Sequence, residues 1–219
     1  YSPGEQLIFD HSTAVRLGDP AVHSIVPDQA RERLLVGTKY GITAIDPFRG
    51  YTSDFYFSPG IEVNTMMYQE IGDSDTLVVA TNVGIHTIPL ENGLPLMEAM
   101  ETREIGSINV IMPLNSESSQ IDFLFMGGEN VWRSRLAQDT SLENSEITFL
   151  ETLSSMLHES NATVLSAGHA TVLGRTPLLL IGTDIGLIGW NTTDGQEDSS
   201  RPWWIFDRIT AEDYVTENI

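Results

Sequence analysis

Short hydrophobic runs separated by polar turns recur along the chain, and one pattern of such runs appears several times. Its clearest copy is LLVGTKYGITAID, which spans Leu34 to Asp46. An aliphatic run is followed by a Gly-Thr pair, then by two further residues and a second glycine. A second, mainly apolar run begins after this glycine. Aliphatic and β-branched runs of this length favour buried strands. Because only a few turn residues lie between them, we predict a β-hairpin here.

The second glycine of the pattern has a predicted role in the turn. Hairpins of this length are commonly closed by a residue in the left-handed conformation, which forms a bulge. Glycine adopts that conformation without a steric penalty. We therefore expect Gly41 to be left-handed in the first hairpin.

The pattern returns twice in good form and once in a degraded form. The good copies are LVVATNVGIHTI, from Leu77 to Ile88, and LLLIGTDIGLIGW, from Leu179 to Trp190. The degraded copy is FLFMGGENVWRSRL, from Phe123 to Leu136, and it lacks the closing glycine. We expect its turn to be one residue shorter, with Asn130 as the nearest residue that tolerates the left-handed region.

The spacing of the hairpins indicates the architecture. The aligned positions Gly37, Ala80, Gly127 and Gly182 are 43, 47 and 55 residues apart. Multi-stranded repeats of about 40 to 50 residues are typical of β-propeller blades. The predicted first strands of the blades begin at His23, Val63, Ser107 and Ala162. The predicted fourth strands begin at Tyr51, Leu96, Ser145 and Trp203.

The predicted fold class is therefore all-β, a β-propeller of about four four-stranded blades. The approximate blade boundaries are 21–60, 61–105, 106–160 and 161–210, within a single propeller domain or partial propeller over 1–219. The longest spacing contains apolar residues at helical spacing; these are Phe149, Leu150, Leu153, Met156 and Leu157. Either a short helix is inserted there, or a longer fourth strand is followed by a loop.

Ring closure is the main physical difficulty for a four-bladed chain. A closed ring has no free edge, whereas a partial ring exposes two blade faces. The chain has no cysteine that could staple a small ring. We expect it to form part of a larger propeller, completed by further blades from the same or another chain. Since it begins at Tyr1 without an initiator methionine, we expect a mature product or an excised fragment.

The repeat RLLVGTKYGITAIDP resembles that of the two-component-regulator type of β-propeller, a sensor-domain family. In that family a Gly-Thr pair ends one strand and a glycine opens the next. Three of the four units carry the pattern well, so the resemblance covers most of the chain. It implies an extracytoplasmic binding module, commonly with more than four blades.

Charge and composition narrow the range of partners. The chain has 31 acidic and 11 basic residues, and Lys39 is its single lysine. Such a negative field repels phosphate backbones, so we expect no nucleic-acid partner. No apolar run is long enough to span a membrane. The acidic surface is either a solubility coat or an attraction for cations or a basic partner.

Candidate binding residues follow from the predicted architecture. Propeller ligands commonly bind at a funnel lined by the first strands and by the turns between the second and third strands. The polar residues expected there are His23, Lys39, Tyr40, Asn64, Asn82, Asn109, Glu129 and Asp184. They either satisfy backbone groups and line a solvent channel, or bind a small ligand or a peptide.

No catalytic motif is evident in the sequence. The serines do not occur in Gly-x-Ser-x-Gly, and the five histidines lack a zinc-binding spacing. The absence of cysteine excludes thiolate zinc sites and cysteine nucleophiles. We therefore assign no catalytic residue, no metal ligand and no cofactor.

Two classes of function remain open. The favoured one is a non-catalytic module for ligand sensing or protein–protein interaction, in a larger extracellular, periplasmic or cell-surface protein. The alternative is a propeller enzyme with a funnel site, such as a calcium-dependent lactonase-like hydrolase or a quinoprotein-like oxidoreductase. Asn64 and Asn109, at matching starts of successive first strands, would be the calcium ligands in that case, because calcium binds oxygen atoms.

Overall fold

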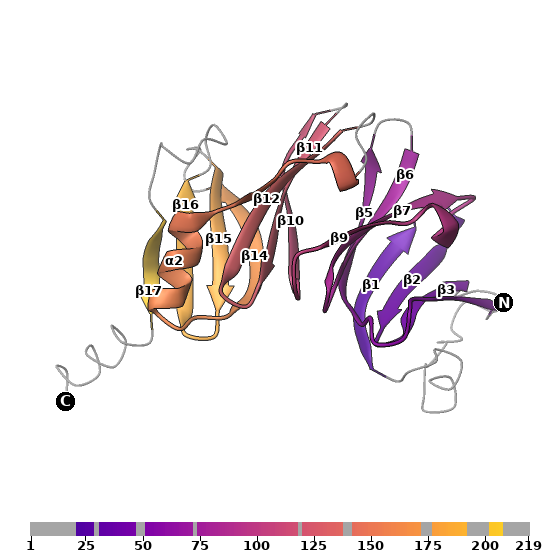
Figure 1. Cartoon of the computed structure of the whole chain (residues 1–219), viewed down its shortest axis with the longest axis horizontal. Helices are drawn as coiled ribbons and strands as arrows, with labels where there is room; N and C mark the ends of the chain where they lie inside the picture. Colours follow the sequence, from indigo (N-terminus) through magenta and orange to yellow (C-terminus); the bar gives the residue numbers. More distant parts are fainter. Residues whose placement is uncertain are drawn as a thin grey trace, which may run out of the picture. The chain divides into compact units, whose positions relative to one another are not determined.

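The computed structural model describes residues 21–28, 31–46, 51–71, 74–117, 120–137, 142–171, 177–191 and 202–207. By contacts between its Cα atoms, the chain divides into two compact units, residues 1–107 (unit 1) and 108–219 (unit 2). Each unit holds two antiparallel sheets of the blade type (Figure 1). The predicted all-β fold of four-stranded blades is therefore confirmed.

The first sheet of unit 1 is a simple meander. It comprises β1 (Val22–Asp28), β2 (Arg33–Thr38), β3 (Gly41–Asp46) and β4 (Tyr51–Tyr56), which pair in chain order. The second sheet begins in the same way with β5 (Val63–Ile71), β6 (Ser74–Thr81) and β7 (Gly84–Glu91). The predicted first hairpin is thus β2 and β3.

The fourth strand of the second sheet differs from the prediction. The short β8 (Leu94–Pro95) and the later β9 (Glu101–Glu104) both pair with β7. Between them, a 3₁₀ turn over Met97–Ala99 replaces the strand predicted to begin at Leu96. Met97 and Met100 are three residues apart and both pack on the core. That spacing matches a 3₁₀ turn, in which such side chains share one side.

Unit 2 repeats the meander twice and adds helical segments. Its third sheet comprises β10 (Val110–Glu117), β11 (Gln120–Gly127), β12 (Asn130–Ala137) and β13 (Ile147–Phe149), with a 3₁₀ turn at Leu142–Asn144. Its fourth sheet comprises β14 (Val164–Thr171), β15 (Pro177–Thr183), β16 (Gly186–Asn191) and β17 (Trp203–Asp207).

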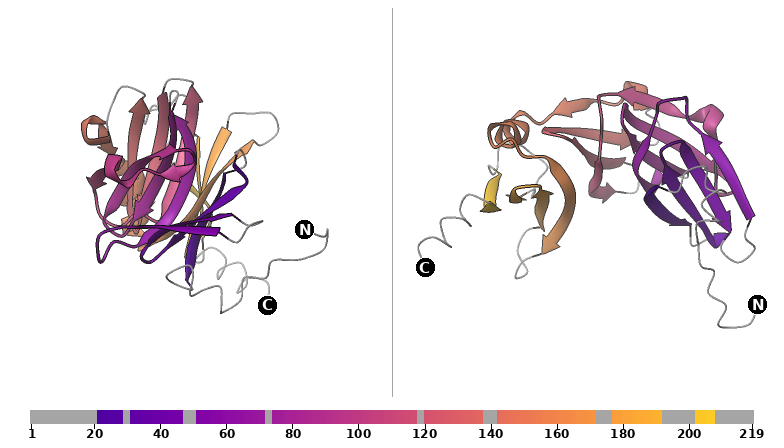
Figure 2. Two further views of the ribbon diagram at one scale, coloured as in Figure 1. Left: turned by 90° about the vertical axis from the view of Figure 1, so that its right-hand side faces the viewer. Right: turned by 90° about the horizontal axis from the view of Figure 1, so that it is seen from below.

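The helical alternative for the longest spacing is correct. Helix α2 (Glu151–Glu159) follows β13 and packs against β12. Figure 2 shows the helix beside the strands of unit 2 from two further sides. Leu153 and Leu157 are buried in the core of unit 2, so the helical spacing of apolar residues marks its inner face.

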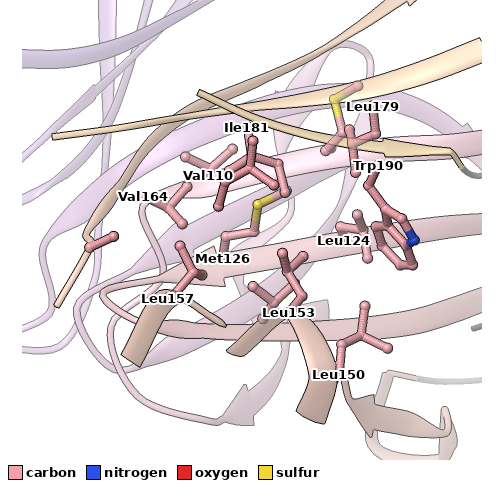
Figure 3. Packing of buried hydrophobic residues seen from close by; sticks show 14 residues of the cluster. Val110, Leu124, Met126, Leu150, Leu153, Leu157, Val164, Leu179, Ile181 and Trp190 are labelled. Atoms are coloured by element: carbon pink, nitrogen blue, oxygen red, sulfur yellow. The ribbon is translucent and has the colours of Figure 1, made fainter. Parts of the chain in front are cut away.

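Each unit has one main apolar core shared by its two sheets. In unit 1 the core contains residues such as Leu35 of β2 and Val79 of β6. In unit 2 it joins β11, α2, β14 and β15, and Figure 3 shows Met126, Leu157 and Ile181 within it. The first strands of the paired sheets pack together, β1 with β5 and β10 with β14. Sheet-on-sheet burial of this kind is how adjacent blades stabilise each other.

The closing glycines are required mainly by a close approach of the fourth strand. Gly41 has a positive φ of 151°, and a Cβ atom there would lie 2.2 Å from the carbonyl oxygen of Phe55. At Gly84 a Cβ atom would lie 2.1 Å from the carbonyl oxygen of Arg103, and no positive φ accompanies it. The predicted positive φ of the closing residue is therefore found at Gly41 and not at Gly84.

The turn of the degraded third hairpin is as long as that of the first hairpin, so the prediction of a shorter turn is wrong. Two residues lie between the last paired residues in each case, which are Thr38 and Gly41 in the first hairpin and Gly127 and Asn130 in the third. The positive φ lies at Gly128, at 59°, and not at Asn130, so that expectation is wrong. Gly128 supplies the conformational freedom that the sequence pattern assigned to the wrong position.

Candidate functional site

The turn between β2 and β3 presents a cation and an aromatic ring. Lys39 and Tyr40 are both exposed, Tyr40 by 50%, and the Lys39 ammonium lies 5.7 Å from the centre of the Tyr40 ring. The Tyr40 amide donates to the Thr38 hydroxyl, and the Tyr40 carbonyl accepts from the amide of Phe57. The backbone of this turn is therefore held on both sides while its side chains project outward.

Asn82, in the turn between β6 and β7, bonds to backbone groups of the segment that precedes β5. Its side-chain oxygen accepts from the amide of Glu62 at 2.9 Å, and its side-chain nitrogen donates to the carbonyl of Gly60 at 2.8 Å. These two bonds hold the segment that leads into β5. Asn82 thus satisfies backbone groups, one of the two roles considered for it.

Asp184 occupies the corresponding turn of the fourth sheet and makes the corresponding contact. Its carboxylate accepts from the amide of Thr163 at 2.7 Å, and its own amide donates to the Thr163 carbonyl. Thr163 immediately precedes β14. Asn82 and Asp184 therefore have equivalent roles, one in each unit. Each side chain bonds the turn between the second and third strands to the backbone just before a first strand.

His23 and Asn64 lie at irregular points of the first strands. The ladders of β1 and β5 are interrupted at these residues, between Val22 and Ser24 and between Val63 and Thr65. The His23 Nδ1 atom lies 2.8 Å from the Val63 carbonyl oxygen, so it donates to that oxygen. The Asn64 side chain donates to the Ser107 hydroxyl at 3.4 Å.

Asn109 does not match Asn64 in register. Asn109 precedes β10, and its amide donates to the carbonyl of Met126 at 2.8 Å, whereas Asn64 lies within the irregular part of β5. The two residues also belong to different units. Within the described ranges, no group of three or more histidine, aspartate or glutamate residues is arranged to hold a metal ion.

Glu129 borders a concave site in unit 2. The site, here called the α2 depression, has a volume of about 260 Å³. It is lined by Glu129, Asn130, Phe149, Ser154, Ser155, His158 and Glu159. Its lining residues come from the turn between β11 and β12, from the end of β13 and from one side of α2.

A carboxylate–imidazole pair dominates the electrostatics of the α2 depression. The Nδ1 atom of His158 lies 2.5 Å from Oε2 of Glu129. The hydrogen bond and charge of Glu129 raise the pKa of the His158 imidazole, and the charge of Glu159 acts in the same direction. The His158 side chain is 79% exposed, so the imidazole can exchange protons directly with solvent.

The walls of the α2 depression are fixed by backbone contacts. The Ser154 hydroxyl accepts from the amide of Val131 at 3.0 Å, and the Val131 carbonyl accepts from the amide of Leu150 at 2.9 Å. The carbonyl of Gly128 accepts from the amide of Val164. Helix, turn and neighbouring sheet are thereby tied together around the site.

The pair of Glu129 and His158 has the residue types of acid–base catalysis. Such a pair activates a nucleophile only when the imidazole also bonds to a hydroxyl or thiol. In the part of the chain that the structure describes, no serine hydroxyl bonds to His158. The geometry is therefore that of a surface ion pair beside a depression.

A second titratable residue, His86 of β7, is buried in unit 1. Its ring nitrogens lie 3.0 Å from the Thr81 hydroxyl and 2.8 Å from the Thr102 hydroxyl, and its ring meets Phe57 edge-on. Burial lowers the pKa of His86 to about 4. The imidazole is therefore neutral at physiological pH and serves as a core hydrogen-bonding group.

Sequence reasoning identified one partner of the ion pair and missed the other. Glu129 lies in a predicted turn, but His158 is 29 residues further on and no motif links them. The available signal was the helical spacing of Leu153 and Leu157, which predicts a helix with its buried face at these residues. His158 then lies on the exposed side of that helix, but nothing in the spacing indicates that it meets Glu129. His86 was likewise missed, because an isolated histidine in a strand carries no sign of its burial.

Comparison with known proteins identifies the fold and no closer relationship. No family model and no curated protein matches the chain. Two solved structures of the extracellular domain of BT4673 from B. thetaiotaomicron match it, with TM-scores of 0.51 and 0.52 and 15% identity. Their protein is named as a hybrid two component system in one and as a one component system in the other.

In both comparisons the match covers 84% of this chain and 22% of the BT4673 domain. The chain therefore spans about a fifth of the length of the structure that it matches. At this level of identity the likeness shows the shared fold. No helix in the described residues is long and apolar enough to cross a membrane.

Proposed function

We propose that the chain is a non-catalytic binding module of a larger protein that works outside the cytoplasm. The observation that carries the proposal is its blade-type fold, which matches an extracellular domain over 84% of the chain. The match covers 22% of that domain, which supports a larger parent protein here too. The module would sense a ligand or contact a protein partner, as propellers without a catalytic constellation do.

We also propose that the four sheets are consecutive blades of one larger propeller. In unit 1, Gly37 lets the next sheet approach, because a Cβ atom there would lie 2.6 Å from Cγ1 of Val63. Gly182 is the aligned residue of the fourth sheet, and its β15 neighbours Leu179 and Ile181 face the core of unit 2. The opposite face, on which Gly182 lies, is therefore where a following blade would pack.

The side chains on that opposite face support this role. Trp203 and Ile205 lie over Gly189 of β16 and are 42% and 46% exposed. Exposed apolar patches mark interaction surfaces. We expect the isolated chain to self-associate through this face. The double variant Trp203→Ser/Ile205→Ser should reduce association in analytical ultracentrifugation, whereas Tyr56→Ser, at an exposed tyrosine of unit 1, should not.

The binding surface that we propose for unit 1 is the turn of Lys39 and Tyr40. Its side chains project from a fixed backbone, whereas Asn82 is held by backbone bonds and its substitution would loosen a loop. A ligand or partner found by screening should lose affinity with Lys39→Ala/Tyr40→Ala and keep it with Glu98→Ala, an exposed control in the same unit. Equal affinity for all three proteins would refute this surface.

Calcium provides the test against the enzymatic class. We expect the thermal midpoint of the chain to be unchanged by calcium and by chelation. A large stabilisation that chelator reverses, and that Asn64→Ala/Asn109→Ala abolishes, would favour a calcium-dependent enzyme instead. The double variant separates a site at these residues from binding to the acidic surface in general.

A further inference from the structure

The α2 depression combines carboxylates with an exposed aromatic ring. Glu129 reaches it from the turn between β11 and β12, Glu159 from α2, and Phe149 from the end of β13. No lysine or arginine is among its described lining residues. Its volume of about 260 Å³ lies below the range of about 300 to 1,000 Å³ typical of small-molecule pockets. It is therefore suited to a single side chain or a small headgroup.

The aromatic wall of the depression is held in place before any ligand arrives. Phe149 pairs with Trp132 across the β12–β13 ladder, and the two rings meet edge-on at 6.1 Å. Phe149 nevertheless remains 47% exposed. The helix beneath is anchored by Leu153 and Leu157. A preformed site of this kind loses little conformational entropy on binding.

The chemistry of these walls selects a planar cation. A guanidinium group is planar and weakly hydrated, donates paired hydrogen bonds to carboxylates and stacks on aromatic faces. The net charge of −20 favours the approach of a positively charged partner. We propose that the α2 depression binds the guanidinium group of an arginine side chain on a basic protein partner, with Glu129 as acceptor and Phe149 as stacking surface.

His158 makes this binding dependent on pH. When protonated, the imidazole neutralises Glu129 and competes with the incoming arginine. The other charged group of the depression is Glu159, and β13 contributes none of its lining charges. Because Glu129 raises the pKa of His158 above its usual value, affinity should increase as pH rises through neutrality. The arginine itself stays charged throughout.

Nuclear magnetic resonance titration with short peptides tests the proposal directly. Acetyl-Gly-Arg-Gly-amide should cause saturable shifts at the backbone amides of Glu129, Phe149 and Ser155. The citrulline peptide has nearly the same shape without the charge. It should bind at least about tenfold more weakly, since a charge-assisted hydrogen bond contributes more than the roughly 1.4 kcal/mol that corresponds to tenfold.

Matched variants identify the residues responsible. Glu129→Gln should lower affinity for the arginine peptide about tenfold, and Phe149→Ala several-fold, whereas the exposed control Glu146→Gln should retain it. His158→Gln should bind with an affinity that no longer changes between pH 6 and 8. Equal binding of both peptides, equal binding by Glu129→Gln, or no shift at these amides would overturn the proposal. The proposal adds a site to the binding module proposed above, and the Lys39–Tyr40 turn has no part in this test. A negative result would therefore overturn the arginine site and leave the proposed surface of unit 1 unaffected.

Discussion

A threonine holds the turn in the first, second and fourth hairpins, whereas the third hairpin has no threonine there. In the second sheet the Thr81 hydroxyl accepts from the amides of Val83 and Gly84 and donates to the Gly84 carbonyl. Thr183 makes the same three bonds in the fourth sheet. A threonine side chain that bonds to nearby backbone groups replaces a turn of the main chain. This explains why the Gly-Thr-x-x-Gly pattern contains threonine.

Substitution of Thr81 by valine should therefore weaken unit 1. Valine keeps the shape of the side chain but leaves the buried amide of Gly84 without its acceptor, which costs about 1 to 3 kcal/mol. Urea unfolding of the whole chain measures this loss. Thr148→Val, at an exposed position of β13, is the control and should change stability by less than about 0.5 kcal/mol. Equal stability of both variants would contradict the role given to Thr81.

The buried His86 predicts a specific dependence of stability on pH. Its folded pKa of about 4 lies below the unfolded value of about 6.5, so the unfolded chain binds more protons in between. Its contribution to stability is complete above about pH 6.5 and is lost as pH falls toward 4. Because one pKa unit corresponds to about 1.4 kcal/mol, the loss is at most about 3 kcal/mol.

Urea midpoints of the wild type and of His86→Gln between pH 4 and 7 measure this contribution. The carboxylates contribute to both proteins alike, so the difference between the two curves isolates His86. The wild type should lose more stability on acidification than the variant. Parallel curves for wild type and His86→Gln would show that His86 does not stay neutral when folded.

At the level of elements, the glycines that open β3 and β7 are required by the close approach of the neighbouring strand. A Cβ atom at Gly84 would collide with the backbone of Arg103, which belongs to β9. Gly84→Ala should therefore displace β9 from β7 and lower stability by more than about 2 kcal/mol. Gly168→Ala in β14 is the matched control, because a Cβ atom there meets nothing within 4 Å. Similar stabilities of the two variants would contradict this explanation.

The hairpins were predictable because their signal is local. Alternating apolar runs and the Gly-Thr pair lie within about a dozen residues, and their spacing indicates blades. The 3₁₀ turn at Met97 and the choice of a helix at Glu151–Glu159 depend on which side chains the core buries. The pair of Glu129 and His158 depends on how a turn meets a helix. Such tertiary contacts leave no trace in the sequence near either residue.

Polar side chains also join the two sheets of unit 1. They lie at the opposite ends of β2 and β6 from Thr38 and Thr81. Arg31 bonds to Asp28 at the end of β1 and to Asp75 of β6, 3.3 Å away in each case. The Tyr68 hydroxyl donates to Asp75, and burial together with this carboxylate raises the pKa of Tyr68 to about 12. These contacts connect the two sheets of unit 1 through Arg31 and Asp75, which are 44 residues apart in the sequence. They complement the apolar core in holding neighbouring blades together.

For the whole molecule, we propose that the sheets are consecutive blades of a ring that further blades complete. Small-angle X-ray scattering of the monomeric 219-residue chain, at concentrations where self-association is absent, tests this most directly. If further blades complete the ring, the radius of gyration should be larger than that of a closed four-bladed disc. A compact, closed-ring profile would contradict it, because the face of Gly182, Trp203 and Ile205 would then already be covered within the chain.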